Sequence, residues 1–226
     1  MLDALETSKR VIVRERRRRP LSPKSTSLDV VIRDLSRDAG ITLQSSLRRC
    51  WVPFAEFAVH WESADAERAT TQNVIGGEAA LSYLYDVASH DTQLATERTD
   101  EPERTLLRSL RVIDDQPAGG NGTLAAVRLL ERELTSGVWF FDVRTGVHEL
   151  DVDYCGYLDA LVTTKAGYGW QYLYADVDLA KPEHRMIRDR LSRLLEFLAT
   201  TFPDVDCAAL RDRFAARTTR TARTRH

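Results

Sequence analysis

The sequence predicts an α+β fold: a single mixed or antiparallel sheet with a central hairpin over residues 137–151, several packed helices and a long amphipathic C-terminal helix. The strings GVWFFDV, RTG and VHEL form two strand-like runs around a short glycine-containing turn. Apolar residues at helical spacing flank this pattern, without the strict strand and helix alternation of a doubly wound sheet. At 226 residues and 43% hydrophobic content, the chain can bury one sizeable core.

Both ends of the chain are rich in arginine. Residues 1–26 combine the run RERRRRP with PLSPKSTS, a composition that buries too little apolar surface to offset ordering entropy. We therefore predict a disordered basic arm over 1–26, a single α+β domain over 27–217 and a disordered basic tail over 218–226.

Helical signals dominate the first half of the domain. Ser27 is a suitable N-cap for a helix that ends at Gly40, because the apolar residues between them lie on one stripe. A second helix is predicted over 53–61, with a favoured first-turn proline and a stripe of aromatic residues. Gly76-Gly77 then breaks the chain, and 82–105 is expected to form a short helix or an irregular segment.

The second half contains the hairpin. A strand is predicted over 106–113, followed by the turn-rich string DDQPAGGNG and a helix at TLAAVRLLEREL. After the hairpin, a helix is expected over 153–164 and a strand at AGYGWQYLYADV. A long amphipathic helix over 181–200 and a shorter one with Leu210 and Phe214 complete the domain. The four tryptophans are interpreted as core residues.

The net charge of −2 conceals an acidic body between two basic ends. Residues 1–24 hold eight Lys and Arg against three Asp and Glu, and residues 208–226 hold six against one. Residues 25–207 hold 18 basic against 30 acidic side chains. An acidic body attracts cationic partners and repels nucleic acid, although acidic surfaces also serve solubility alone.

Three cysteines, Cys50, Cys155 and Cys207, match neither a disulfide framework nor a CxxC metal clip. A reducing compartment is the simplest interpretation, with Cys155 expected as a buried, inert thiol. No run of 18 apolar residues and no signal-like segment occurs. We therefore expect a cytoplasmic protein with no membrane span.

Carboxylates recur as Asp-Val-Asp at 151–153, 176–178 and 204–206. Each pair precedes a helical pattern, so helix capping is favoured over binding of Mg²⁺ or Ca²⁺. The scattered histidines lack zinc spacing, and Asp114-Asp115 beside GGNG lacks the Lys-Ser/Thr of a phosphate loop. No metal, no cofactor and no catalytic residue are predicted.

A family resemblance lies in VWFFDVRTGVHELDVDYCGYLDALVTTKAGYGWQYLY. This segment reads as a strand ending in Phe-Asp, a glycine turn, a second strand and a helix with a Tyr-x-x-Tyr-Leu rhythm. In that order it resembles the C-terminal half of SUKH-superfamily proteins, which include the yeast Knr/Smi cell-wall regulators. The resemblance covers roughly 106–179, with a partial echo of the N-terminal signature at Val52-Pro53, Phe57 and Gly76-Gly77. It implies binding without catalysis, as in bacterial immunity proteins that neutralise toxins.

The leading hypothesis is a non-enzymatic protein-binding module of the immunity or antitoxin type, with a basic toxin as partner. The expected contacts are acidic residues in or near the hairpin: Asp114, Asp115, Asp142, Glu149 and Asp151. Two alternatives stay open. One is an enzyme that uses an aspartate cluster from the Asp-Val-Asp pairs. The other is association with nucleic acid through the arginine-rich ends, above all Arg16, Arg17, Arg18 and Arg19.

Overall fold

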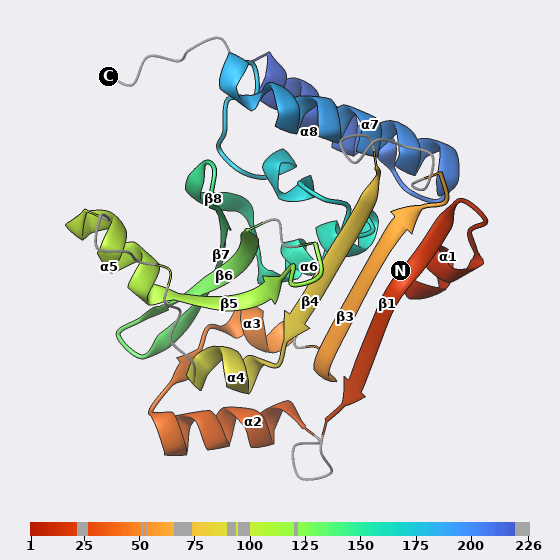
Figure 1. The fold of residues 1–226 in the computed structure, drawn as a ribbon. Helices are drawn as coiled ribbons and strands as arrows, with labels where there is room; N and C mark the ends of the chain where they lie inside the picture. Colours follow the sequence, from red (N-terminus) through yellow and green to blue (C-terminus); the bar gives the residue numbers. More distant parts are fainter. Residues whose placement is uncertain are drawn as a thin grey trace. The chain divides into compact units, whose positions relative to one another are not determined.

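The computed structural model describes residues 1–21, 27–50, 52, 54–65, 74–89, 94, 100–119 and 122–219. Within these residues the chain forms one mixed sheet and eight α-helices, which confirms the predicted α+β class (Figure 1). The helices are α1 (Leu2–Thr7), α2 (Leu28–Asp34), α3 (Ser45–Arg49), α4 (Leu84–Ser89), α5 (Glu101–Ser109), α6 (Tyr154–Thr163), α7 (Arg185–Thr201) and α8 (Cys207–Thr218).

The strands follow the order β1-β3-β4-β5-β6-β7-β2 in the sheet, and β8 also pairs with β7. The bounds are β1 (Val11–Pro20), β2 (Thr42–Leu43), β3 (Phe54–Ser63), β4 (Gly76–Ser82), β5 (Leu110–Asp115), β6 (Thr123–Leu130), β7 (Glu133–Asp142) and β8 (Gly146–Asp153). The pairs from β4 to β8 are antiparallel, whereas β2 runs parallel to β7. The sheet is therefore mixed.

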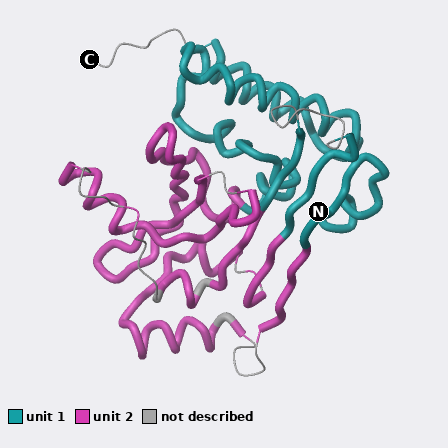
Figure 2. Tube along the Cα trace, in the orientation of Figure 1, with its two compact units in different colours: residues 1–15, 59–78, 158–226 teal, residues 16–58, 79–157 magenta. Residues whose placement is uncertain are grey.

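The chain divides into two compact units (Figure 2). Unit 1 contains residues 1–15, 59–78 and 158–226, and unit 2 contains 16–58 and 79–157. β1, β3 and β4 each have residues in both units, so the division between the units runs through these strands. The single domain over 27–217 stays a prediction.

The predicted hairpin is confirmed in unit 2. Phe141 pairs with Val147 and Asp142 with Gly146, whose φ of 86° suits the tight turn that joins β7 to β8. The predicted helix at 153–164 follows as α6. The hairpin and α6 are thus set by local sequence signals.

Helices at both ends of the predicted domain are also confirmed. Ser27 Oγ accepts a hydrogen bond from Val30 N at 3.4 Å at the start of α2, and Gly40 ends the following π-helical turn with a φ of 63°. In unit 1, α7 buries the stripe that contains Leu191, Leu194 and Leu198, and packs against α8 (Figure 1). Among the described residues, no helix has both the length and the apolar content that a membrane crossing requires.

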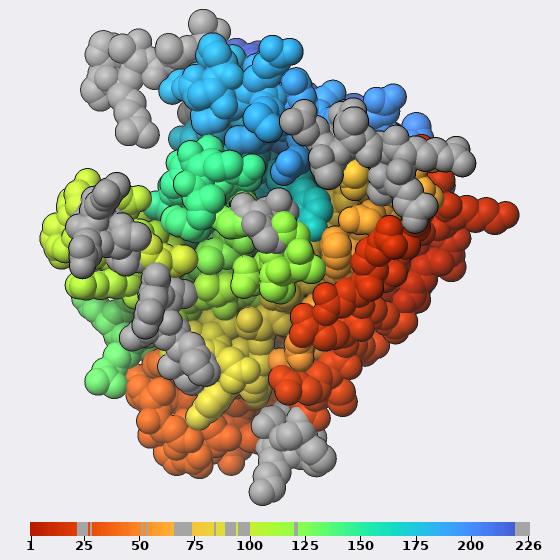
Figure 3. Space-filling model, in the orientation of Figure 1, coloured from red at the N-terminus to blue at the C-terminus, as the bar shows by residue number. Residues whose placement is uncertain are grey.

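The prediction of a disordered arm over 1–26 is wrong for residues 2–7 and 11–20, which form α1 and β1. The arginine run is ordered because its charges find partners along β3: Arg17 contacts Glu56 at 2.9 Å in unit 2, and Arg14 contacts Glu62 at 2.9 Å in unit 1. These first residues, in red, lie at the surface of the face drawn in Figure 3. Residues 22–26 and 220–226 of the predicted arm and tail lie outside the described residues.

Two predictions in the first half are wrong. The segment predicted as a helix over 53–61 is the strand β3 from Phe54 onward, where aromatic and β-branched residues suit a pleated, half-buried surface. Pro53 lies outside the described residues. Gly76-Gly77 does not break the chain but begins β4, and both glycines are buried. A Cβ on Gly77 would collide with Ala166 O and Trp61 Nε1, so glycine permits this close approach.

Three predictions in the second half are also wrong. The strand predicted over 106–113 begins only at Leu110, because residues 106–109 are the last turn of α5. TLAAVRLLEREL forms β6 and the start of β7, joined by Glu131 and Arg132 at positive φ of 47° and 69°. Apolar residues point to both faces of β6 and therefore imitate a helical pattern. AGYGWQYLYADV is a turn and a 3₁₀ helix (Trp170–Leu173), in which successive side chains are all buried, so the alternation of a strand is absent.

Candidate binding face and disulfide

One face of β5 to β8 carries a half-buried apolar row, which we call the Trp139 face. The register aligns Asp115, Leu124, Phe141 and Val147 across four strands, and it aligns Ala126, Trp139 and Glu149 beside them. Cross-strand partners lie on the same side of a sheet. The Trp139 face is defined as these exposed or half-buried residues: Asp115, Leu124, Trp139, Phe141, Val147 and Glu149.

Helix α5 covers only part of the Trp139 face. Leu107 and Leu110 form a buried cluster with Ala126, and the larger side chains of the face pack against that cluster while remaining partly exposed. Arg128 is anchored by Ser109 Oγ at 2.9 Å, and its guanidinium lies 5.5 Å from the centre of the Trp139 ring. The Arg128 guanidinium therefore lies over the indole ring of Trp139.

The opposite face of the same strands is the core of unit 2. Ala125, Val127, Val138 and Phe140 are each at most 1% exposed. The buried Asp114 lies among them: its Oδ1 accepts a hydrogen bond from Ala80 N, and its Oδ2 accepts one from Tyr157 Oη of α6, both at 2.7 Å. Burial, assisted by the charge of Asp114, raises the pKa of Tyr154 well above its usual value.

The five predicted contact residues differ in their exposure to solvent. Asp114 and Asp142 are 2% and 0% exposed, so they cannot form a contact surface, and the prediction is wrong for these two. Asp142 accepts from the backbone N of Arg144 at 2.8 Å and pairs with its guanidinium at 2.7 Å, which closes the hairpin turn. The three exposed members stay predicted contacts: Asp115, Glu149 and Asp151.

The arginine run Arg16–Arg19 lies in β1, where intramolecular contacts hold its side chains. Arg17 and Arg19 contact Glu56 at 2.9 and 3.8 Å, and the Arg18 guanidinium lies 4.4 Å from the centre of the Phe54 ring. These contacts compete with phosphate binding, because the same guanidinium groups already neutralise a carboxylate or stack on a ring.

The Asp-Val-Asp motifs act mainly at helix starts and turns. Asp153 Oδ1 accepts from Gly156 N at 2.9 Å, and Asp206 Oδ1 accepts from Ala208 N at 3.1 Å. Asp178 Oδ1 accepts from Ala180 N at 3.0 Å in a turn. The capping interpretation is confirmed for Asp153 and Asp206. Among the described residues, no group of three or more His, Cys, Asp or Glu side chains is arranged to hold a metal ion.

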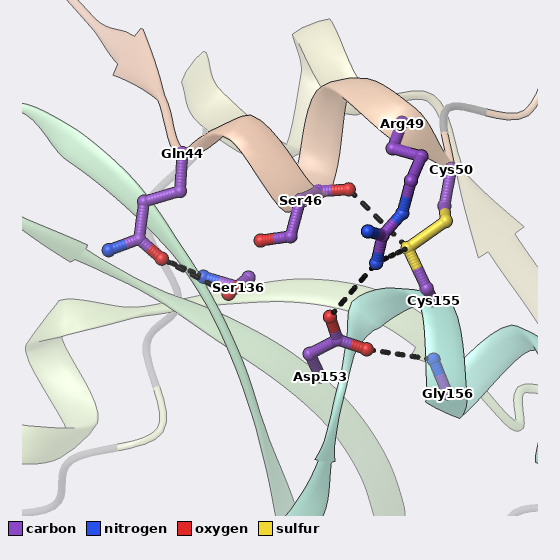
Figure 4. Close-up of polar contacts among 8 residues, drawn as sticks. All are labelled: Gln44, Ser46, Arg49, Cys50, Ser136, Asp153, Cys155 and Gly156. Atoms are coloured by element: carbon purple, nitrogen blue, oxygen red, sulfur yellow. Dashed lines mark hydrogen bonds and ion pairs between the residues drawn. A yellow bond between two sulfur atoms is a disulfide. The ribbon is translucent and has the colours of Figure 1, made fainter.

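A disulfide joins Cys50, directly after α3, to Cys155 in the first turn of α6, with Cα atoms 5.4 Å apart (Figure 4). The expectation of an inert thiol at Cys155 is therefore wrong, because a separation of 105 residues in sequence says nothing about distance in the fold. The Gln44 side chain accepts from Ser136 N at 2.8 Å and so fixes the start of α3 to β7. Cys207 is free and buried, and burial raises the pKa of its thiol.

Charged groups surround this disulfide. An Arg49 guanidinium nitrogen lies 3.5 Å from Cys155 Sγ and 3.8 Å from the Asp153 carboxylate, so it sits between the two (Figure 4). The Ser46 carbonyl oxygen lies 3.4 Å from the same sulfur. Both cysteines are half-buried.

Unit 1 has a small pocket with a cavity volume of about 10 Å³, which is room for about one water molecule. Tyr168 Oη in its lining donates to the buried Glu78 at 3.3 Å. Burial and the nearby Glu78 charge raise the pKa of Tyr168 well above its usual value, so the phenol stays protonated and is no general base near neutral pH. The pocket is lined by Val74, Ile75, Gly76, Tyr168, Arg190, Arg193 and Leu194.

Sequence reasoning missed the apolar part of the Trp139 face, because it interpreted every tryptophan as core. The available signal was the unbroken run Val138 to Phe141, in which a strand places apolar side chains on both faces. Comparisons of the chain with models of protein families, with curated proteins and with solved structures found no match.

Proposed function

We propose that this chain is a non-enzymatic protein-binding module of the SUKH type, which holds a basic partner protein on the Trp139 face. The immunity or antitoxin role, with a basic toxin as partner, is the specific form of this proposal. The observation that carries it is the row of half-buried apolar side chains with exposed carboxylates beside it. Protein interfaces commonly combine aromatic anchors with a polar rim.

The anchors in this row are ordered before any partner binds. Trp139 packs beside Arg128, and Phe141 packs against the cluster that α5 forms with β5 and β6. Both rings lie on strands paired on each side, so little conformational entropy remains to be lost on binding. Rigid aromatic side chains at a partly open face are suited to be binding hot spots.

The charge of the face selects the partner. Glu149 lies opposite Trp139 and Asp115 opposite Leu124, and Asp151 is exposed farther along β8. The body between the two ends of the chain holds 30 acidic against 18 basic side chains. Complementary charge accelerates encounter with a basic surface, and the rim carboxylates then set the register.

The test begins with capture of a partner from the lysate of the source organism, followed by titration with that purified protein. Trp139→Ser is expected to weaken binding about tenfold or more, because it removes an aromatic anchor. Glu149→Gln is expected to lower the association rate about threefold, with an effect that shrinks as salt is added.

Asp159→Asn is the matched control, since Asp159 is an exposed carboxylate on α6 outside the Trp139 face. It removes the same charge as Glu149→Gln and should leave binding unchanged. Recovery of the chain alone, or equal affinity for wild type and Trp139→Ser, would contradict the proposal.

The enzyme alternative finds no support in the carboxylates described above. Asp153 and Asp206 cap helices in different units, and Asp114 and Asp142 are engaged by hydrogen bonds in the core. We keep the cytoplasmic location as part of the proposal. The pairing of Cys50 with Cys155 removes one of the two arguments for it, the match of the cysteines to a reducing compartment.

A further inference from the structure

We propose that Cys50–Cys155 is an exchangeable disulfide, which a small thiol opens by attack on Cys50 Sγ with release of Cys155 as the thiolate. The direction of opening follows from the charged groups around Cys155. It concerns a site separate from the Trp139 face and does not depend on the proposed binding function.

Two features stabilise negative charge on Cys155. The Arg49 guanidinium lies 3.5 Å from its sulfur. Cys155 is the second residue of α6, a helix of ten residues, so its sulfur lies at the end where backbone N–H groups and the helix dipole favour an anion. In thiol–disulfide exchange, the sulfur that best carries negative charge is the better leaving group.

Two groups oppose this charge. The Ser46 carbonyl oxygen lies 3.4 Å from Cys155 Sγ, and the Asp153 carboxylate shares Arg49 at 3.8 Å. Asp153 also accepts a hydrogen bond from Gly156 N at 2.9 Å through its other carboxylate oxygen (Figure 4). The Arg49 guanidinium lies between the Asp153 carboxylate and the sulfur that becomes an anion when the disulfide opens. Arg49 then gains the Cys155 thiolate as a second anionic neighbour.

The exchange balances in two steps. A thiolate RS⁻ attacks Cys50 Sγ, an R–S–S–Cys50 bond forms, and the Cys50–Cys155 bond breaks with its electron pair on Cys155 Sγ. A second RS⁻ attacks the R sulfur of this mixed disulfide and releases RSSR and the Cys50 thiolate, which takes a proton from water. Two thiols are oxidised to one disulfide while the protein disulfide is reduced.

Accessibility supports the exchange, because Cys50 and Cys155 are both half-buried instead of enclosed in the core. Opening removes the covalent tie between the end of α3 and the start of α6. The start of α3 stays fixed, since Gln44 bonds Ser136 and β2 pairs with β7. The expected consequence is a local release of the Arg49–Cys50 end of α3 without loss of the fold.

The experiment uses the full chain with 2-mercaptoethanol, a neutral thiol that Arg49 cannot attract by charge. The protein is first denatured and alkylated without reductant, and only Cys207 should be modified; alkylation of all three cysteines would overturn the proposal. Native protein is then treated with the thiol, quenched in acid and mapped by mass spectrometry. The mercaptoethanol adduct is expected on Cys50, and an adduct mainly on Cys155 would overturn the proposal.

Matched variants test the role of charge. Arg49→Leu is expected to slow opening about threefold, because the leaving thiolate loses its cation. Asp153→Asn is expected to speed opening, since Arg49 then has one anionic neighbour fewer. Arg48→Leu removes an exposed charge from the same helix and should leave the rate unchanged. Equal rates for Arg49→Leu and Arg48→Leu in folded protein, checked by circular dichroism, would contradict the assignment of Cys155 as the leaving sulfur.

Discussion

Tyr157 donates its phenolic hydrogen to Asp114 Oδ2 at 2.7 Å, and this hydrogen bond connects α6 to β5 inside the core of unit 2. Tyr157 is fully buried and Asp114 is 2% exposed, so water cannot replace a partner that either group loses. The pair explains why an aspartate can occupy the core face of a sheet between apolar neighbours.

Tyr157→Phe removes this hydrogen bond and retains the ring. We expect a loss of about 2 kcal/mol in the free energy of unfolding, because a buried carboxyl group is left with one donor fewer. Urea denaturation measures the loss. Tyr168→Phe is the matched control: its hydroxyl makes a longer hydrogen bond of 3.3 Å to Glu78 from a half-buried ring, and a smaller loss is expected. Equal losses would contradict this ranking.

Gly77→Ala tests the close approach inside unit 1. The added Cβ would collide with the backbone oxygen of Ala166 and with Trp61 Nε1, which donates to Lys165 O at 2.7 Å. The backbone must shift to accommodate the methyl group, so a loss of about 3 kcal/mol in stability is expected. Gly137→Ala is the control, since the nearest atom to its Cβ is 3.8 Å away. Similar unfolding midpoints for the two variants would disprove the steric argument.

Asp206→Ala tests the helix cap of α8. The Asp206 side chain accepts from Ala208 N at 3.1 Å and from Ala209 N at 3.4 Å, so its removal should cost about 1 kcal/mol of stability. Asp212→Ala removes an exposed charge within the same helix and should change stability by less than about 0.5 kcal/mol. Addition of Mg²⁺ or Ca²⁺ should leave the melting temperature of wild type unchanged. A cation-dependent increase that Asp206→Ala abolishes would instead favour metal binding.

Lys165 gives a prediction for alkaline pH. Burial lowers the pKa of its ammonium group, with the charge of Asp204 acting in the opposite direction. The unfolded chain therefore binds this proton up to a higher pH than the folded chain does. Between the lowered pKa and the ordinary value near 10.5, the contribution of Lys165 to stability increases as pH rises.

Lys165→Met should remove that increase. Urea midpoints of wild type and variant are compared from neutral pH to the ordinary lysine range, and the variant should gain relative stability at the lower pH values. Lys181→Met is the control, because Lys181 is exposed. Parallel pH profiles for wild type and Lys165→Met would show that burial does not act on this ammonium group.

Local sequence was sufficient to predict several helices and the hairpin. The hairpin follows from Gly146 between two apolar runs, and α2 follows from Ser27 as an N-cap. The stripe of leucines in α7 and the aspartate before α8 act within a few residues along the chain. Such signals depend on neighbours in sequence, so they predict these elements without knowledge of the fold.

Sequence patterns gave wrong predictions where other parts of the chain pack on a segment or pair with it. β6 is apolar on its core face and also on its α5 side, which removes the alternation that identifies a strand. β1 is predicted as a disordered arm because the carboxylates that pair with its arginines lie far along the chain: Glu62 is 48 residues after Arg14, and Glu56 is 39 residues after Arg17. Charge composition alone does not report such distant partners.

The candidate sites show the same division between local and distant information. The sequence determined that acidic residues cluster around the hairpin and that Asp153 and Asp206 precede helices. Only the tertiary structure decided that Asp114 and Asp142 are buried while Glu149 is exposed, and that Cys50 lies next to Cys155. The physical reason is that side-chain exposure and disulfide pairing depend on strand register and helix packing, which join residues far apart in the chain.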